Sequence, residues 1–180
     1  MLELPIHKSV RLILVSPHYP ENLGAACRAA KTMGFLKLGL VRPSRLATPE
    51  HPMAVKMAVK SGDILEGIEI FENLDEALVG SDIVVGTTAK KGVSGIVSPS
   101  KLAHRLLSWA VQKKKVTIVF GNEKTGLSKE DLARCDLHLR IPIAAAQPSL
   151  NLAQAVQIIC YALFNAALEA RESQASAQEQ

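Results

Sequence analysis

Short apolar runs that alternate with longer helical patterns constrain the fold of this chain more than any other feature. The run from Val10 to Val15 is continuous and rich in β-branched residues, which is typical of a strand buried on both faces. The other predicted strands span residues 36–41, 67–71, 82–87, 116–120 and 137–141. The predicted helices span residues 22–33, 49–59, 74–79, 99–112 and 149–168, and Gly34 has the position of a C-terminal capping glycine for the first of them. This alternation predicts an α/β fold, with a mainly parallel sheet and helices on both of its faces.

The chain has 180 residues, which suits one domain with its own core. We expect that domain to span residues 1–168, because residues 169–180 are polar, lack apolar periodicity and predict an irregular tail. The 3 cysteines form no CxxC pair and the 5 histidines form no HxxxH pair, so no metal site is expected.

The segment from Leu150 to Leu168 is apolar enough to suggest a membrane span. However, polar side chains recur along it at three- and four-residue steps, and five of them within one span would be costly in lipid. We therefore predict a packed helix, for which a subunit interface is one location, and no membrane association. The N-terminus shows no basic region followed by an apolar one, so we expect a cytoplasmic protein.

The charge balance indicates a polyanionic partner. The formal net charge is +4 and the isoelectric point is near 9.0, whereas aromatic residues make up only 4% of the chain. This low aromatic content argues against proteins that stack nucleic-acid bases on aromatic side chains.

Three loops follow predicted strands, at the sheet edge where open parallel sheets bind ligands. The first runs from Ser16 to Arg28, the second from Gly121 to Leu127 and the third from Ile141 to Asn151. The second is not a phosphate-binding P-loop, because no lysine follows its second glycine. Gly121 would permit close approach of the backbone to a ligand, and Glu123 would lie near the strand end.

Local explanations compete with functional ones in each loop. In the second loop, Ser128 and Asp131 have the spacing of a helix capping box. In the third, Ser149 and Asn151 have the positions of helix-capping residues, and the apolar character of this loop indicates a buried segment or a pocket lining. In the first, Arg28 taken alone would be a surface arginine.

The motif segments occur in order, each after a strand: Asn22-Leu-Gly-Ala-Ala-Cys-Arg-Ala29, Phe120-Gly-Asn-Glu-Lys-Thr-Gly-Leu127, and Ile141-Pro-Ile143 with Pro148-Ser-Leu-Asn-Leu-Ala153. Together they resemble the three motifs of the SpoU/TrmH family, which are RNA 2′-O-methyltransferases of the SPOUT superfamily. Within that family the chain looks most like the TrmJ-like tRNA (cytidine/uridine-2′-O)-methyltransferases. This closer likeness rests on Lys31-Thr-Met-Gly34, Asp75-Glu-Ala-Leu78, Val84-Val-Gly-Thr87 and Ser149-Leu-Asn-Leu-Ala-Gln-Ala-Val156. Asn122 departs from the pattern, since such proteins often carry Arg or Ser there.

The resemblance implies a fold that ends in a deep C-terminal trefoil knot, and a site for S-adenosylmethionine in the loops of that knot. By motif alignment, the cofactor-binding residues are Thr87, Thr88, Ala89, Gly121, Ile141, Pro148, Ser149 and Leu150. The implied activity is methyl transfer to a ribose 2′-hydroxyl, most readily in the tRNA anticodon loop, by a homodimer.

The resemblance also implies roles for five residues in this reaction. Arg28 would bind the target phosphate and polarise the 2′-hydroxyl, in its own subunit or across the dimer interface. Asn22 and Glu123 would orient Arg28 and its loop, while Ser149 and Asn151 would shape the ribose end of the site. Two alternatives remain: the same chemistry on another tRNA or rRNA nucleotide, and a knotted RNA-binding protein without catalysis.

Several basic residues could contact RNA phosphates, although each alone is also explained as part of a solvated face. They are Lys90 with Lys91, Lys101 with Arg105, Lys113 to Lys115, Lys124 and Lys129.

Overall fold

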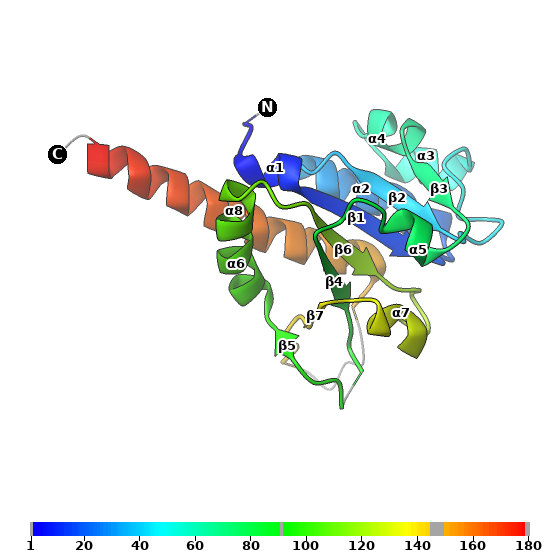
Figure 1. The fold of residues 1–180 in the computed structure, drawn as a ribbon. Helices are drawn as coiled ribbons and strands as arrows, with labels where there is room; N and C mark the ends of the chain where they lie inside the picture. The colour runs from blue at the N-terminus through cyan, green and yellow to red at the C-terminus, as the bar shows by residue number, and fades with distance from the viewer. Residues whose placement is uncertain (1, 91, 145–149, 179–180) are drawn as a thin grey trace.

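The computed structural model describes residues 2–90, 92–144 and 150–178, and its seven strands form one parallel sheet (Figure 1). The strands lie in the order β3-β2-β1-β6-β4-β7-β5. Their bounds are β1 Val10–Val15, β2 Leu38–Val41, β3 Glu69–Phe71, β4 Ile83–Thr87, β5 Ile96–Val97, β6 Val116–Phe120 and β7 Leu137–Leu139. The predicted parallel α/β fold is therefore confirmed.

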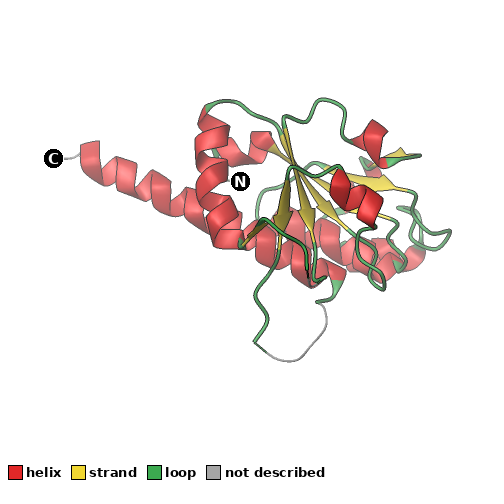
Figure 2. Ribbon diagram, turned by 60° about the horizontal axis from the view of Figure 1, so that its bottom comes forward, coloured by secondary structure: helices red, strands yellow, loops and turns green. Residues whose placement is uncertain are grey.

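Helices cover both faces of the sheet, as Figure 2 shows. Their bounds are α1 Pro5–Ser9, α2 Pro20–Thr32, α3 Pro52–Met57, α4 Gly62–Glu66, α5 Leu74–Ala77, α6 Pro99–Val111, α7 Lys129–Ala133 and α8 Leu152–Gln178. The larger core cluster lies under α1, α2, α6 and α8, and the smaller cluster lies under α5 and α7. The two faces thus have cores of unequal size.

Strand β1 contributes side chains to both cores. Leu12 and Leu14 belong to the larger cluster, whereas Ile13 and Val15 belong to the smaller one. Successive side chains of a strand point to opposite faces, so a run that is apolar at every position can satisfy both cores at once. This explains why β1 has the bounds that its continuous apolar run predicts.

Helix α2 ends in a Schellman motif at the predicted glycine. Gly34 has φ +83, the N–H of Phe35 donates to the carbonyl of Ala30 at 3.0 Å, and the N–H of Gly34 donates to Lys31 at 2.9 Å. A Cβ at position 34 would also come within 2.6 Å of the His7 ring, so only glycine fits there.

Helix α8 buries one face against α2 and α6. That face contains Val156, Ile159, Cys160, Leu163 and Ala167. By length and composition alone, with a mean hydropathy of 1.3, α8 is the one described helix that could cross a membrane. Its packed inner face is that of a core helix, in agreement with the predicted packing.

The predicted irregular tail differs from the structure, because α8 continues to Gln178 and its end projects from the body (Figure 1). The Ser173 and Ser176 hydroxyls donate to carbonyls four residues earlier, and Ala, Glu, Gln and Arg favour helix without any packing partner. The helix also begins at Leu152 rather than at the predicted residue 149.

The short elements differ most from the prediction. Helices α1 and α4 and strand β5 have no counterpart in it, and the helix predicted over residues 49–59 spans only Pro52–Met57. Elements of two to six residues carry too few periodic positions to be recognised, and tertiary packing decides them.

Protonation of His7 should destabilise the fold. His7 is buried, its Nδ1 accepts a hydrogen bond from the Leu4 N–H at 3.1 Å, and its ring lies beside Phe35 and Phe164. Burial lowers the pKa of His7 below its usual 6.5, so the folded state binds this proton more weakly than the unfolded state does. The stability contributed by neutral His7 is therefore complete above pH 6.5 and is lost as the pH falls through the folded-state pKa.

Denaturant unfolding between pH 8 and pH 5 measures this effect. The His7→Phe variant should show a smaller loss of unfolding free energy on acidification than the parent protein. The matched variant His104→Gln, at an exposed position of α6, should keep the parent's dependence. Equal pH dependence in all three proteins would contradict the assignment to His7.

Candidate active site

Three N–H groups converge on the carboxylate of Glu123, in the loop that follows β6. The backbone N–H of His18 donates to Oε2 at 2.8 Å, and that of Tyr19 donates to Oε1 at 3.2 Å. The side-chain Nδ2 of Asn22, in the first turn of α2, also donates to Oε1 at 2.8 Å. Charge-assisted bonds of this kind are among the stronger hydrogen bonds in proteins. Glu123 thus joins the loops after β1 and β6.

Asn22 extends this arrangement to α8. It is only 8% exposed, and its Oδ1 accepts a hydrogen bond from Nδ2 of Asn151 at 2.7 Å. Asn151 is also the N-cap of α8, because its Oδ1 accepts from the Ala153 N–H at 2.9 Å. The structure therefore brings together three of the five residues predicted to act in catalysis. Asn151 has both the predicted capping role and a contact within the site.

Arg28 is not brought into this group. It lies on α2, but six residues separate it from Asn22, which places it ~9 Å further along the helix axis and about 120° around it. Arg28 is exposed, and its guanidinium makes no hydrogen bond to any residue that the structure describes. Ser149, the fifth predicted residue, lies outside the described residues.

The second loop is shaped by Asn122, whose role the sequence analysis missed. Its Nδ2 donates to the Ser16 carbonyl at 2.7 Å, and its Oδ1 accepts from the N–H groups of Lys124 and Thr125 at 2.9 and 3.2 Å. An asparagine directly after a strand is a recognised turn signal, and it could have indicated this role.

Gly121 is needed for a reason other than the predicted one. A Cβ at this position would lie 2.2 Å from the Leu127 backbone nitrogen and 2.3 Å from the Gly126 carbonyl carbon. The close approach is thus between the two ends of the loop itself. Gly121 is therefore required by the loop itself, and the approach of a ligand to it stays a prediction.

The described residues predicted to bind the cofactor follow adjacent strands. Thr87 ends β4, and the Thr88 N–H donates to the Leu139 carbonyl of β7 at 2.9 Å. Ala89 is exposed, while Ile141 and Leu150 are half-buried. Because β4 pairs with both β6 and β7, the segments after these three strands share one edge of the sheet. Pro148 lies, like Ser149, outside the described residues.

A cavity of about 450 Å³ lies beside the second loop, at the carboxyl ends of β1, β2 and β6. Its lining includes Ser16, Arg42, Lys90 and Asn122. Ser16 and Arg42 both have left-handed backbone conformations, with φ 49 and 46. Such conformations are uncommon for residues other than glycine, and they cluster at functional sites. No sequence signal distinguished Arg42.

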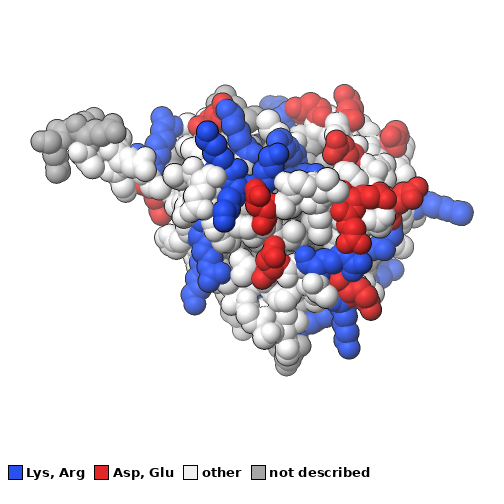
Figure 3. All heavy atoms as spheres, in the orientation of Figure 1, with Lys and Arg blue, Asp and Glu red and all other residues white. Residues whose placement is uncertain are grey.

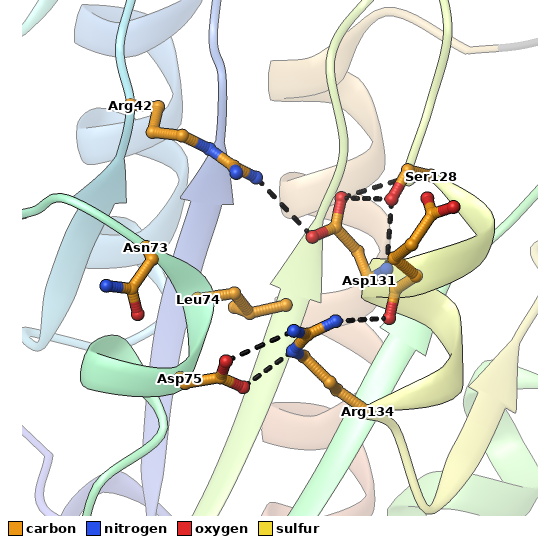
Figure 4. A pocket seen from close by; sticks show the side chains of 8 residues that line it. Arg42, Asn73, Leu74, Asp75, Ser128, Asp131 and Arg134 are labelled. Carbon is orange, nitrogen blue, oxygen red and sulfur yellow. Dashed lines mark hydrogen bonds and ion pairs between the residues drawn. The ribbon is translucent and has the colours of Figure 1, made fainter.

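A smaller cavity of about 220 Å³ continues from it between α5 and α7 (Figure 4). Asp131 lies where the two cavities meet: it completes the predicted capping box with Ser128 and is 3.5 Å from Arg42. Arg134 makes a bidentate contact with Asp75 at 2.6 and 3.1 Å, and its guanidinium lowers the pKa of that carboxyl group. The Arg134–Asp75 pair joins the end of α7 to α5, and the Arg42–Asp131 pair joins α7 to the end of β2.

The cysteines are not nucleophiles. Burial raises the pKa of Cys27 and of Cys135 to about 12 and also raises that of Cys160, so all three thiols are protonated at neutral pH. Within residues 2–90, 92–144 and 150–178, no three His, Cys, Asp or Glu side chains are grouped so as to hold a metal ion.

Comparison with protein families matches residues 9–161 to the SpoU rRNA methylase family. A curated relative, the tRNA (cytidine/uridine-2′-O-)-methyltransferase TrmJ of Sodalis glossinidius, is 35% identical over 173 residues. That match covers 95% of this chain but 66% of the relative, so the chain spans just under two thirds of the relative's length.

Two solved structures share the fold over most of the chain. A probable methyltransferase from Bordetella pertussis Tohama I has a TM-score of 0.85 and 31% identity, covering 90% of this chain and 98% of its own. A structure concerned with the 2-OH methylation of C/U34 on tRNA has a TM-score of 0.69 and 25% identity, covering 87% and 95%.

Replacing Glu123 by glutamine should destabilise the protein by about 1–3 kcal/mol. The amide retains the shape of the carboxylate but turns an N–H₂ group toward N–H donors, which leaves buried donors unsatisfied. Denaturant unfolding measures the change, with Glu50→Gln at an exposed position as the matched control. A cost within about 0.5 kcal/mol, the range of ordinary surface substitutions, would show that the Glu123 contacts contribute little.

Proposed function

The chain belongs to the SpoU rRNA methylase family, and on this basis we propose that it is an S-adenosylmethionine-dependent methyltransferase acting on a ribose 2′-hydroxyl of tRNA. The observation that carries the proposal is the hydrogen-bonded series Asn151–Asn22–Glu123, which joins the three motif loops at the carboxyl edge of the sheet. The target is a nucleotide of the anticodon loop, as in the relative that acts on C/U34. The tRNA pool makes the cytoplasm the expected compartment.

Two features of the described residues fit the cofactor. Arg140, at the end of β7, has a buried Nε without a hydrogen-bond partner, which is what a missing polar ligand group leaves behind. Ile143 in the next loop is 37% exposed and offers apolar surface of the kind that adenine covers. The residues that would hold the cofactor are Thr87, Thr88, Ala89, Gly121, Ile141, Pro148, Ser149 and Leu150. When bound, S-adenosylmethionine supplies the sulfonium methyl group that is transferred.

The path of the chain supports a C-terminal trefoil knot. Strand β7 is separated from β1 by β4 and β6, yet Asn151 binds Asn22 next to the end of β1. Leu139 and Asn151 therefore lie on either side of β4 and β6 at the carboxyl edge of the sheet, an arrangement that a knotted C-terminal segment requires. We assign residues 1–168 to this single methyltransferase domain, since one core cluster extends from Leu4 to Ala167.

Arg28 is the group that we assign to the substrate. Asn22, Glu123 and Asn151 are hydrogen-bonded to one another. The N–H groups of the Arg28 guanidinium have no partner among the described residues and are available to a ligand. A guanidinium is well suited to bind a phosphate, and next to one it would polarise the neighbouring 2′-hydroxyl and hold it for in-line attack. Ser149 and Asn151 would shape the ribose end of the site.

Arg28→Ala should reduce methyl transfer to tRNA by about 10²- to 10⁴-fold. It should leave the S-adenosylmethionine affinity and the unfolding free energy nearly unchanged, because Arg28 is exposed and lies away from the proposed cofactor loops. Single-turnover transfer, calorimetry and mass spectrometry of the tRNA nucleosides measure these quantities, with Arg171→Ala in the projecting end of α8 as the control. Retained transfer would remove Arg28 from the mechanism, and a parent protein that binds no S-adenosylmethionine would favour the non-catalytic RNA-binding alternative.

We further propose that the active unit is a homodimer in which Arg28 acts in the partner's site. Asn22 and Arg28 face different directions on α2, so one site that uses both needs a second chain. The packed pair α2 and α8 also exposes apolar surface, with Ile158 37% and Tyr161 54% exposed. Tyrosine is enriched at protein interfaces because it combines large apolar area with a polar end.

Tyr161→Asp should dissociate this dimer and abolish methyl transfer together, because a charge would be buried at the interface. Light scattering after size exclusion measures the mass. The matched control is Val79→Asp, just after α5, where Val79 is 76% exposed and lies outside the proposed interface. A fully active monomer would contradict the shared site.

A further inference from the structure

Charge is distributed very unevenly along this chain. Residues 83–122 contain seven Lys and Arg and no Asp or Glu, so the other 140 residues have a net charge of −3. The overall value of +4 conceals this separation. The acid-free segment includes β4, β5, α6 and β6.

The cations of this segment gather on and after α6. Lys101 and Arg105 are four residues apart, so they lie on one side of the helix, and both are exposed. Lys113, Lys114 and Lys115 follow the end of α6. Lys113 has a left-handed backbone conformation, with φ +58, and the chain turns toward β6 at Lys113 and Lys114. Figure 3 shows Lys and Arg side chains over this part of the molecule, with Asp and Glu mainly on the opposite side. Many of those acids belong to α4, β3 and α5.

None of the α6 cations is in an ion pair among the residues that the structure describes. The Asp82 carboxylate accepts a hydrogen bond from the backbone N–H of Lys115 at 2.7 Å and makes no ion pair with its ammonium group. Other basic residues predicted to contact RNA have partners: the Lys90 ammonium donates to the Leu127 carbonyl, and Lys124 lies 5.5 Å from the centre of the Tyr19 ring. Lys129 is followed directly by Glu130 and Asp131. The structure thus separates the α6 cations from the rest of the predicted set.

The α6 cations also lead away from the candidate active site. Helix α6 follows β5 and precedes β6, so it runs from the carboxyl edge of the sheet back to the amino edge. From Lys101 to Lys113 it spans ~18 Å at 1.5 Å per residue. Lys114 and Lys115 come just before β6, whose five residues put them ~16 Å from the strand end that leads to Glu123. A ligand small enough to fill the active site cannot reach them.

We propose that the α6 surface, defined as Lys101, Arg105, Lys114 and Lys115, binds the phosphate backbone of tRNA outside the loop that contains the target ribose. This inference rests on the proposed function and adds a second contact region to it. Lys101, Arg105 and Lys115 are exposed and Lys114 is half-buried. Cations without ion pairs in an extended track fit a polyanion better than a small anion, which needs convergent donors. A membrane surface fits less well, because the apolar face of α6, including Leu102 and Leu106, is buried in the core.

The test compares Lys114→Gln/Lys115→Gln with the parent protein on two RNAs, full-length tRNA and its isolated anticodon stem–loop. For full-length tRNA the Kd should rise about tenfold or more at 0.1 M salt. The slope of log K against log salt should become shallower by ~1.4–1.8, which corresponds to two lost phosphate contacts. The stem–loop affinity should stay the same. The variant Lys101→Gln/Arg105→Gln should behave alike on full-length tRNA.

The matched control is Lys56→Gln/Lys60→Gln, which removes two exposed lysines near the acidic side and should change neither the Kd nor the slope. Three outcomes would overturn the proposal. Both α6 variants could bind tRNA as the parent does, or they could lose affinity for the stem–loop as much as for full-length tRNA. In the third, the parent binds anionic vesicles and the α6 variants lose that binding while they still bind tRNA. The methylation rate at saturating tRNA and the S-adenosylmethionine Kd should match the parent in every variant. If the parent itself binds no S-adenosylmethionine and methylates no tRNA, the proposed function fails, and the salt-dependence result still tests the α6 surface.

Discussion

The candidate active site depends on the carboxylate of Glu123 and on the three hydrogen bonds that it accepts from N–H groups. This single side chain fixes the loop after β1 to the loop after β6, and Asn22 passes the constraint on to Asn151 and the start of α8. The residues that these bonds join are more than 100 positions apart in sequence, so the bonds form only when the segments that carry them have folded together. A buried amide or carboxylate without its partner costs free energy, and each member therefore holds the others in one geometry.

This arrangement divides the polar residues into those that the fold uses and those that it leaves free. Asn22, Asn122 and Glu123 satisfy backbone and side-chain groups of neighbouring loops, so they position the site. Arg28 and the cations of the α6 surface have no such internal partners among the described residues. A binding group must keep donors available for its ligand, and only the second class does so. Position and binding are thus supplied by different residues.

The sequence predicted those features that depend on local signals. The bounds of β1 and β6 follow from continuous apolar runs, and Gly34 and the Ser128 capping box follow from the backbone requirements of helix ends. The motif resemblance also singled out Asn22, Glu123 and Asn151, but not the bonds between them, which join distant segments. The steric requirement for glycine at position 121 was not predicted, because the atoms that a Cβ would meet are brought there by the closure of its own loop. Short elements such as α4 and β5 were missed, since packing rather than pattern determines them.

The separation of charge changes what the composition means for recognition. An isoelectric point near 9.0 gives no information on where the charges lie. Figure 3 shows Lys and Arg gathered over α6 and most Asp and Glu toward the other end of the same face, where further basic residues also lie. Such a distribution would orient a polyanion as well as attract it. With few aromatic residues to stack on bases, the proposed choice of an RNA substrate would depend on the positions of phosphates more than on base stacking. The distance between the α6 surface and the loops around Glu123 would then select RNAs by their dimensions. An RNA is a good substrate when its folded shape presents the target ribose and a distant stretch of backbone at that separation.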